Sequence, residues 1–310
     1  MILQVVLIAV VSIFSPLIGL ILAIPYFAKK IIPENSNVII EGDKNSNSLI
    51  QSYFLTGQTS LISLIGIFTA SLLLLLVIKF LSLQRLVEVW VAVGLASVIF
   101  SSVLQKLKKY EFAILYASLP GFVFISIKNL FFFNSIKEQL EQSQQLLLEN
   151  IEQMFSPEML ENIMPSLIKM QNMFLNGNAA IWMFGTILGI FIGALILSNK
   201  LNWLRWNFDS VNFPFYLQIA IAVGLILFIF KLKIASYNML VICGFFYLIQ
   251  GYSLLFFFMK RTFRRTFFLG IVLLIIPFFN YYLLIIISIF GLLDTWIHFR
   301  ELTLLRGDRQ

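Results

Sequence analysis

The sequence predicts an all-α fold, a polytopic transmembrane helical bundle of seven to eight spans with an amphipathic helical segment outside the membrane. Of the 310 residues, 60% are hydrophobic and 12% are charged, whereas soluble domains average about 45–50% and about 25%. The mean hydropathy is +0.93, and several apolar runs reach the length of about 18 residues that crosses a bilayer. Lipid offers backbone polar groups no partners, so helices are expected to cross it. A disordered chain, a secreted disulfide scaffold and a soluble nucleic-acid-binding protein are disfavoured.

Eight apolar segments are expected to cross the membrane: Ile2–Ala28, Leu61–Ile78, Leu86–Gln105, Phe112–Phe133, Ala179–Leu197, Phe215–Phe230, Tyr237–Met259 and Phe267–Phe299. No Lys or Arg precedes the first apolar run, unlike in a signal peptide. Pro16 and Pro25 interrupt the first segment, and Pro277 and Asn280 interrupt the last. Each end segment is therefore either one tilted helix or a broken one that folds back and reverses the side of its terminus.

Basic residues in the loops indicate the orientation of the chain. With the N-terminus outside, the inner loops 29–60, 106–111, 198–214 and 260–266 hold 12 Lys and Arg, and the outer loops hold 6. The outer stretch 134–178 contains six Glu and only two Lys. Cytoplasmic loops carry the excess of Lys and Arg in membrane proteins, so the net charge of +7 is interpreted as membrane topology rather than as a nucleic-acid-binding surface.

Two polar stretches separate the apolar segments. Residues 31–48 are rich in Asn and Ser and are expected to form a loop. The stretch 135–177 is expected to be amphipathic and helical, with a second helix starting at Ser156-Pro157-Glu158. We therefore divide one integral bundle into N-terminal membrane helices at 1–134, this extramembrane segment, and C-terminal membrane helices at 178–310.

Small residues at helical spacing predict close helix packing. They form two stripes, one of Gly185, Gly189 and Gly193 and one of Ser15, Gly19 and Ala23. Such stripes let the backbones of apolar helices approach each other in lipid. Packing within this chain is the favoured interpretation, and docking of a membrane partner subunit or a second copy is the alternative.

Polar residues within or beside the apolar runs are the candidate ligand-binding positions: Asn238, Gln250, Gly251, Asn280 and Asp294. A Gln in hydrocarbon needs a hydrogen-bond partner, which is another helix or a ligand. Asp294 and His298 share a face if the last helix continues through them. Near the end of that run, Trp296, His298 and Arg300 are interpreted as interfacial anchors.

Motifs for catalysis and cofactor binding are absent from the sequence. It contains no phosphate-binding loop, no dinucleotide fingerprint and no zinc-protease or serine-hydrolase motif. One cysteine, Cys243, and one histidine leave no metal-ligand pattern. We expect no catalytic residue, no metal and no cofactor, so the protein is not predicted to be an enzyme.

The second half of the chain resembles the YybS-like family of predicted bacterial membrane proteins, whose function is unknown. The resemblance rests on an ordered set of features. A Glu/Gln-rich amphipathic stretch precedes a glycine-rich helix, and a linker with Trp206 and Pro214 follows it. Then come Asn238-Met-Leu, Phe246-Tyr-Leu-Ile-Gln250-Gly251 and the ending Gly291-Leu-Leu-Asp294-Thr-Trp296-Ile-His298-Phe-Arg300. The match covers residues 135–305 well and the first half loosely.

That family is distantly similar to the substrate-capture subunits of energy-coupling-factor uptake transporters, small helical membrane proteins that bind a vitamin or metal and dock on an ATP-driven module. The resemblance implies a small-molecule-binding transport component in the bacterial cytoplasmic membrane. Its expected partners are the lipid bilayer, an unidentified small molecule, and a membrane subunit or second copy, but not nucleic acid. The alternative is a membrane scaffold or regulator that acts through partner helices, for which the Met-rich stretch 154–173 is the motivation.

Overall fold

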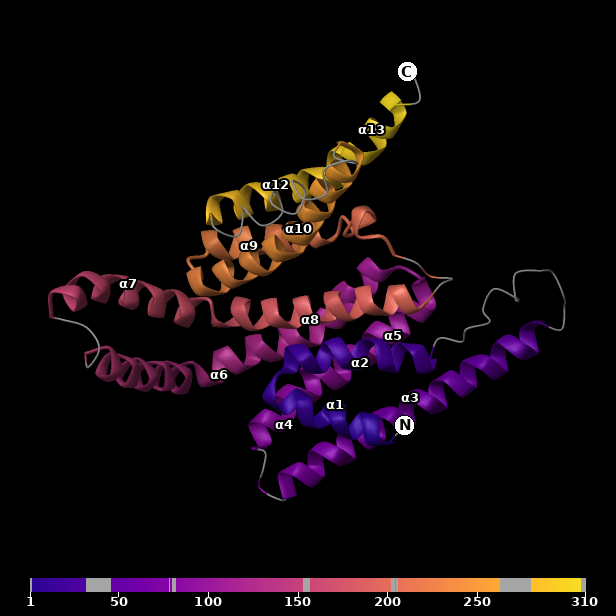
Figure 1. Cartoon of the computed structure of the whole chain (residues 1–310), viewed down its shortest axis with the longest axis horizontal. Helices are drawn as coiled ribbons and strands as arrows, with labels where there is room; N and C mark the ends of the chain where they lie inside the picture. Colours follow the sequence, from indigo (N-terminus) through magenta and orange to yellow (C-terminus); the bar gives the residue numbers. More distant parts are fainter. Residues whose placement is uncertain are drawn as a thin grey trace. The chain divides into compact units, whose positions relative to one another are not determined.

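The computed structural model describes residues 2–31, 46–77, 79, 82–152, 157–201, 204, 206–262 and 280–307. Within these ranges all regular structure is helical, and no residue lies in a strand (Figure 1). A long apolar segment forms a helix because the helix pairs its own backbone N–H and C=O groups by hydrogen bonds. The predicted all-α class is therefore confirmed.

The helices of the N-terminal half are α1 (Ile2–Phe14), α2 (Pro16–Ile31), α3 (Ser46–Val77), α4 (Leu83–Val89), the π-helical segment η2 (Trp90–Leu95), α5 (Ala96–Leu107) and α6 (Tyr110–Glu152). Those of the C-terminal half are α7 (Pro157–Asn176), α8 (Asn178–Lys200), the 3-10 helix η3 (Phe208–Ser210), α9 (Leu217–Ile229), α10 (Lys233–Thr262), α12 (Tyr281–Ile297) and α13 (Phe299–Gly307).

The chain forms two compact units. The first consists of Met1–Gly121, Gly185–Leu217 and Gly244–Gln310, and the second of Phe122–Phe184 and Gln218–Cys243. Helices α6, α8 and α10 contribute residues to both. Each unit is assembled from segments that are distant in sequence.

Four helices of the described residues are long and apolar enough to cross a membrane: Leu83–Leu107, Tyr110–Asn129, Asn178–Lys200 and Lys233–Lys260. They correspond to the third, fourth, fifth and seventh predicted segments. Shorter apolar helices occupy Ile2–Phe14, Pro16–Lys29, Ile62–Val77, Leu217–Ile229 and Tyr282–Ile297. A polytopic helical membrane protein is the architecture that these helices support.

The first predicted segment, Ile2–Ala28, forms two helices rather than one. The chain bends at Ser15, immediately before Pro16, which lacks the N–H that would continue the helix. The bend brings Gly19 so close to Ser12 that a Cβ atom on the glycine would overlap the serine hydroxyl. The small residue at position 19 therefore permits the bend.

Arg85, in α4, satisfies the end of α1. Its Nε and Nη2 atoms donate to the carbonyl oxygen of Ile13 at 3.2 and 2.9 Å. Its Nη1 atom lies 2.9 Å from Oε1 of Glu88, whose side chain is buried. The last carbonyls of a helix have no partner within the helix, so this guanidinium both caps α1 and neutralises a buried carboxylate.

The predicted polar stretches differ from the structure at their edges. Helix α6 continues from the fourth apolar segment to Glu152, with non-helical angles of φ −118° and ψ 17° at Phe132. Helix α7 starts at Pro157, where the sequence predicts a helix start. Of the predicted loop 31–48, the last three residues belong to α3, and residues 32–45 lie outside the described residues.

The glycine stripe of α8 packs on α2. A Cβ atom on Gly189 would lie 3.0 Å from Cβ of Leu20, and one on Gly193 would lie 3.0 Å from Cβ of Ile24. Gly185 has no such neighbour within 4 Å among the described residues. Two of the three stripe glycines therefore make a close contact, and that contact lies within this chain.

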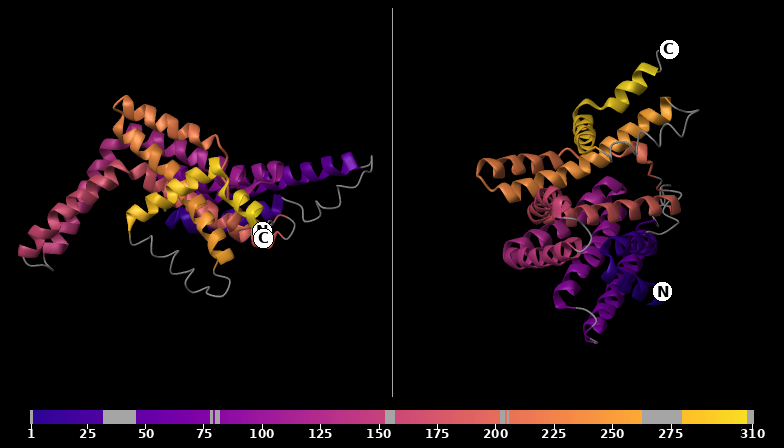
Figure 2. Two further views of the ribbon diagram at one scale, coloured as in Figure 1. Left: turned by 90° about the horizontal axis from the view of Figure 1, so that it is seen from above. Right: turned by 60° about the vertical axis from the view of Figure 1, so that its left-hand side comes forward.

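Helices α10 and α12 lie side by side and run parallel (Figure 1 and Figure 2). Three contacts of rising residue number set this register: Ser288 with Gly244, Gly291 with Tyr247, and Thr295 with Gln250. Cβ atoms on Gly251 and Gly291 would overlap backbone carbonyls of the opposite helix, so only glycine fits at either position. Because the two helices are parallel, their C-terminal ends lie at the same end of the pair.

The last predicted segment, Phe267–Phe299, is thus not one straight helix. Asn280 is the N-cap of α12, and its side chain accepts a hydrogen bond from the backbone N–H of Tyr282. Residues 263–279 lie outside the described residues. The parallel register selects the folded-back alternative, in which the chain after α12 lies at the Lys260 end of α10.

Candidate functional site

The linker between α8 and α9, defined here as residues 206–216, meets the start of α6 and the end of α10. The ring of Trp206 stacks on that of Tyr110 with centroids 5.1 Å apart, and its Nε1 atom donates to Oε1 of Glu111 at 2.8 Å. Further along, the ring of Phe208 contacts that of Phe256 in α10. These aromatic contacts fix the linker at one end of the first unit.

Gln250 holds the linker from the side of α10. Its side chain is fully buried, and its Oε1 atom accepts a hydrogen bond from the backbone N–H of Phe213 at 3.0 Å. Its Nε2 atom donates to Oδ1 of Asn212 at 3.1 Å and to Oγ1 of Thr295 at 3.3 Å. The amide is therefore engaged with the protein on both sides, so Gln250 positions the site and does not itself face a ligand.

Arg300 holds the linker from the side of α13. Its Nη1 atom donates to the carbonyl oxygen of Val211 at 2.9 Å, and its Nη2 atom donates to Oγ of Ser253 at 3.0 Å. Nη2 also lies 3.3 Å from Oδ2 of Asp294, with only 14% and 3% of the two side chains exposed. Burial lowers the pKa of Arg300, whereas the nearby carboxylates, Asp294 first, act in the opposite direction.

The ion pair depends on the end of α12. His298 has a φ of 51°, in the left-handed region, and its N–H donates to the Asp294 carbonyl. The helix thus ends at Ile297, and a continuous helix through His298 and Arg300 is wrong. His298 and Asp294 do not share a helical face, because the turn redirects the chain and returns Arg300 to Asp294.

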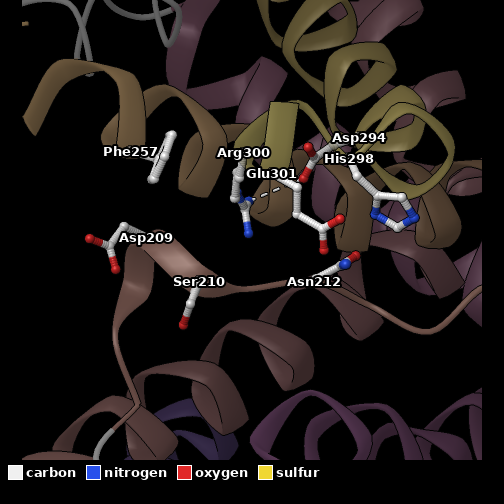
Figure 3. A pocket seen from close by; sticks show the side chains of 8 residues that line it. All are labelled: Asp209, Ser210, Asn212, Phe257, Asp294, His298, Arg300 and Glu301. Atoms are coloured by element: carbon white, nitrogen blue, oxygen red, sulfur yellow. Dashed lines mark ion pairs between the residues drawn. The ribbon is translucent and has the colours of Figure 1, made fainter. Parts of the chain in front are cut away.

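A pocket of about 330 Å³ opens at this junction (Figure 3). Its lining residues are Asp209, Ser210, Asn212, Phe257, Asp294, His298, Arg300 and Glu301. In Figure 3 the linker residues lie along one side of the space, and Arg300 and Glu301 extend from the opposite side. The lining thus combines three carboxylates with one guanidinium, one imidazole and one aromatic ring.

Asp294 is the least exposed acid in this lining. Only 2% of the residue is exposed, and its Oδ1 atom has no hydrogen-bond partner among the described residues. The Nε atom of Arg300 is in the same condition. Buried polar atoms are nearly always paired, and each exception asks for an explanation. A polar molecule that enters the pocket would supply one.

The other two carboxylates of the pocket differ in their engagement. Oδ2 of Asp209 forms an ion pair with Nζ of Lys260 at 2.9 Å, and the lysine side chain is 65% exposed. Glu301 is exposed, and within the described part of the chain its carboxylate makes no hydrogen bond or ion pair. Glu301 is therefore the most accessible charge in the pocket.

The remaining predicted positions lie elsewhere. Asn238, in the second unit, accepts from the N–H of Ala180 at 2.8 Å and donates to the carbonyl of Asn176 at 2.7 Å, so it joins α7 to α8. Gly251 is a packing position, Asn280 is a helix cap, and Trp296 is 56% exposed. Of the five candidate ligand-binding residues, only Asp294 lines this pocket.

A second cavity of about 480 Å³ lies in the second unit, lined by Asn172, Met173, Asn176, Lys233, Ile234 and Tyr237. It carries one charged side chain and no buried acid. Among the described residues, no group of three His, Cys, Asp or Glu side chains is placed to hold a metal ion. The pocket beside Asp294 is therefore the stronger candidate for recognition of a charged molecule.

Several residues of this pocket carry no signal in the sequence. Asp209, Ser210 and Asn212 lie in a linker without a motif, and Glu301 follows the last apolar segment. Residues that face each other on a helix are three or four positions apart, whereas Asp294 and Arg300 are six apart. The one signal in the sequence is an acid at the end of an apolar segment, and of the pocket residues this signal identifies only Asp294.

The comparisons with known proteins identify the family. The family of predicted membrane proteins designated DUF2232 matches residues 50–295. No curated protein and no solved structure matches the chain. The matched region contains most of the chain, including α10, the linker and Asp294, and it agrees with the resemblance to YybS-like membrane proteins. The chain therefore belongs to the DUF2232 family of predicted membrane proteins.

Proposed function

We propose that this membrane protein binds a small polar molecule in the pocket between the linker and Asp294, Arg300 and Glu301. The observation that carries the proposal is the buried Asp294 carboxylate, which lines the pocket and leaves Oδ1 unpaired. The pocket volume of about 330 Å³ lies in the range of small-molecule sites, roughly 300–1,000 Å³. Binding, without a catalytic step, is the role these groups support.

We further propose that the pocket opens on the cytoplasmic side of the cell membrane. Support comes from the loops that meet there. Tyr110 lies in the basic loop 106–111, Trp206 belongs to the loop 198–214, and Lys260 begins the loop 260–266. All three are basic loops that the distribution of Lys and Arg assigns to the inside. A ligand from the cytoplasm would reach this pocket without crossing lipid.

A role as the capture component of an uptake transporter is the more specific form of the proposal. A capture subunit takes up its ligand from outside the cell, whereas we propose that this pocket opens to the cytoplasm. Within a transporter, the structure would therefore represent the inward-open state of the site. Two of the three glycines in the stripe of α8 already pack on α2, so this stripe is mainly an internal contact. We therefore place ligand binding before docking as the property to test.

The test measures ligand-dependent thermal stabilisation of the purified full chain in lipid nanodiscs across vitamins, cofactors, amines, amino acids and carboxylates. A ligand present at 100 times its Kd stabilises the folded state by about 2.7 kcal/mol, so binding gives a clear shift in Tm. We expect the Ser210→Trp variant to lose the shift, because Ser210 is exposed and lines the pocket.

Leu146→Trp is the matched control, since Leu146 is exposed in α6 and distant in sequence from the pocket. A Tm shift that survives in Ser210→Trp would place the ligand elsewhere. No shift with any compound would favour the alternative of a scaffold that acts through its helices.

A further inference from the structure

We infer that the ligand of this pocket is a small organic cation, such as an amine or a quaternary ammonium compound. The inference rests on the proposed function and specifies its ligand. The combination that carries it is a buried acid with an unpaired oxygen, an exposed acid that has no partner among the described residues, and an aromatic ring, all lining the same pocket.

The charges of the pocket favour a cation. Asp209, Asp294 and Glu301 bring three carboxylates. Arg300 and Lys260 each form an ion pair with one of them, Asp294 and Asp209 respectively. The Glu301 charge then remains without compensation among the described residues. A bound monovalent cation would neutralise it, whereas an anion would increase the repulsion.

Within the described residues, Arg300 keeps only its Nε atom free for a ligand, and a single donor cannot form the paired bonds that hold an anion. Its terminal nitrogens donate to the carbonyl of Val211 and to Oγ of Ser253, and Nη2 also forms the ion pair with Asp294. A guanidinium recognises carboxylates and phosphates through two parallel bonds from such nitrogens. An anion would have to displace these contacts, which also hold the linker in place. Arg300 is therefore a positioning residue for Asp294 and the linker.

Two further groups suit an ammonium ligand. Asp209 already binds one ammonium, that of Lys260, with Nζ 2.9 Å from Oδ2. Phe257 closes another side of the pocket (Figure 3), and an aromatic face attracts quaternary ammonium groups. Acidic and aromatic groups thus surround the space from both α10 and the linker.

The experiment compares choline with its neutral isostere, 3,3-dimethylbutan-1-ol, and with putrescine and acetate. Affinities are measured by thermal shift and calorimetry on the full chain in phosphatidylglycerol nanodiscs. We expect choline or putrescine to bind, and the neutral isostere and acetate not to. The affinity should fall as salt is raised, because charge attraction is screened.

Glu301→Gln removes the Glu301 charge with little change in shape. The variant should fold normally, since the Glu301 carboxylate contacts no partner in the part of the chain that the structure describes. We expect it to raise the Kd of the cation by about threefold to tenfold. Glu138→Gln, at an exposed position of α6, is the control of equal charge and should not change binding. A shift of Kd in both variants alike would contradict a local role for Glu301.

A second arm separates a free cation from a lipid headgroup of the same chemistry. If phosphatidylcholine in the nanodisc competes with choline, the headgroup occupies the pocket, and if it does not, the ligand is a free cation. Both outcomes support the inference. Binding of a neutral or anionic compound that Ser210→Trp abolishes and Glu301→Gln leaves unchanged would overturn the cation and retain the proposed function. No binding by any compound overturns both.

Discussion

Asp294 and Arg300 stand six residues apart in the sequence, yet Nη2 of the arginine lies 3.3 Å from Oδ2 of the aspartate. The contact exists because α12 ends at Ile297 and His298 turns the chain with a φ of 51°. The same turn directs Glu301 to the pocket. The geometry of one helix end therefore sets both the buried ion pair and the accessible acid.

The first prediction concerns the cost of breaking this ion pair. Arg300→Met leaves Asp294 as an uncompensated buried charge, which is expected to destabilise the fold by about 3–5 kcal/mol. The double variant Asp294→Asn/Arg300→Met removes that charge and should be less destabilised than Arg300→Met alone. Unfolding in detergent with increasing SDS measures the differences. Additive effects of the two single substitutions would contradict a direct interaction.

Particular elements show what the sequence could predict. Helices α8 and α10 follow from their length and composition, since an apolar run of that length has few alternatives in lipid. The parallel register of α10 and α12 does not follow, because it depends on two glycines that meet only in three dimensions. The end of α12 was also missed, because His is not the residue that usually takes a left-handed conformation at a helix end.

The second prediction concerns the contact between α10 and α12. Gly251→Ala places a Cβ atom against the carbonyl group of Ile287, and Gly291→Ala places one against that of Tyr247. Backbone atoms cannot rotate away as side chains do, so the helices must separate. Each variant should lose at least about 1–3 kcal/mol of unfolding free energy, the usual cost of overpacking.

Glycines with open surroundings supply the control for that prediction. A Cβ atom on Gly66 or Gly185 would meet no atom of the described residues within 4 Å. Alanine there should be neutral or stabilise the helix by up to about 1 kcal/mol, the difference in helix propensity. Equal loss of stability at all four positions, measured by the same SDS titration, would show that the α10–α12 contact is not specially close.

The third prediction concerns Arg85. Arg85→Leu removes two hydrogen bonds to Ile13 and the ion pair with the buried Glu88. We expect a loss of several kcal/mol, since removing one partner of a buried ion pair is costly. Adding Glu88→Gln should restore part of it, because only the helix cap remains broken. Thermal unfolding of the wild type, the single variant and the double variant measures these changes in stability. If Glu88→Gln restores no stability, the buried carboxylate is not the cause of the loss.

The last prediction concerns the side of the membrane on which the pocket and the C-terminal helix lie. Single cysteines are introduced in a Cys243→Ala background, at Ser210 and Leu302 near the pocket and at Gln145 in the acidic stretch 134–178. A membrane-impermeant maleimide is then applied to intact and to permeabilised cells. Because the parallel register of α10 and α12 places α13 beside the linker, positions 210 and 302 should react alike, and only after permeabilisation. Position 145 should react in intact cells, because the low content of Lys and Arg in the stretch 134–178 predicts that it lies outside. If position 302 reacts in intact cells while 210 does not, the last segment crosses only once, and the pocket beside Asp294 cannot form as described.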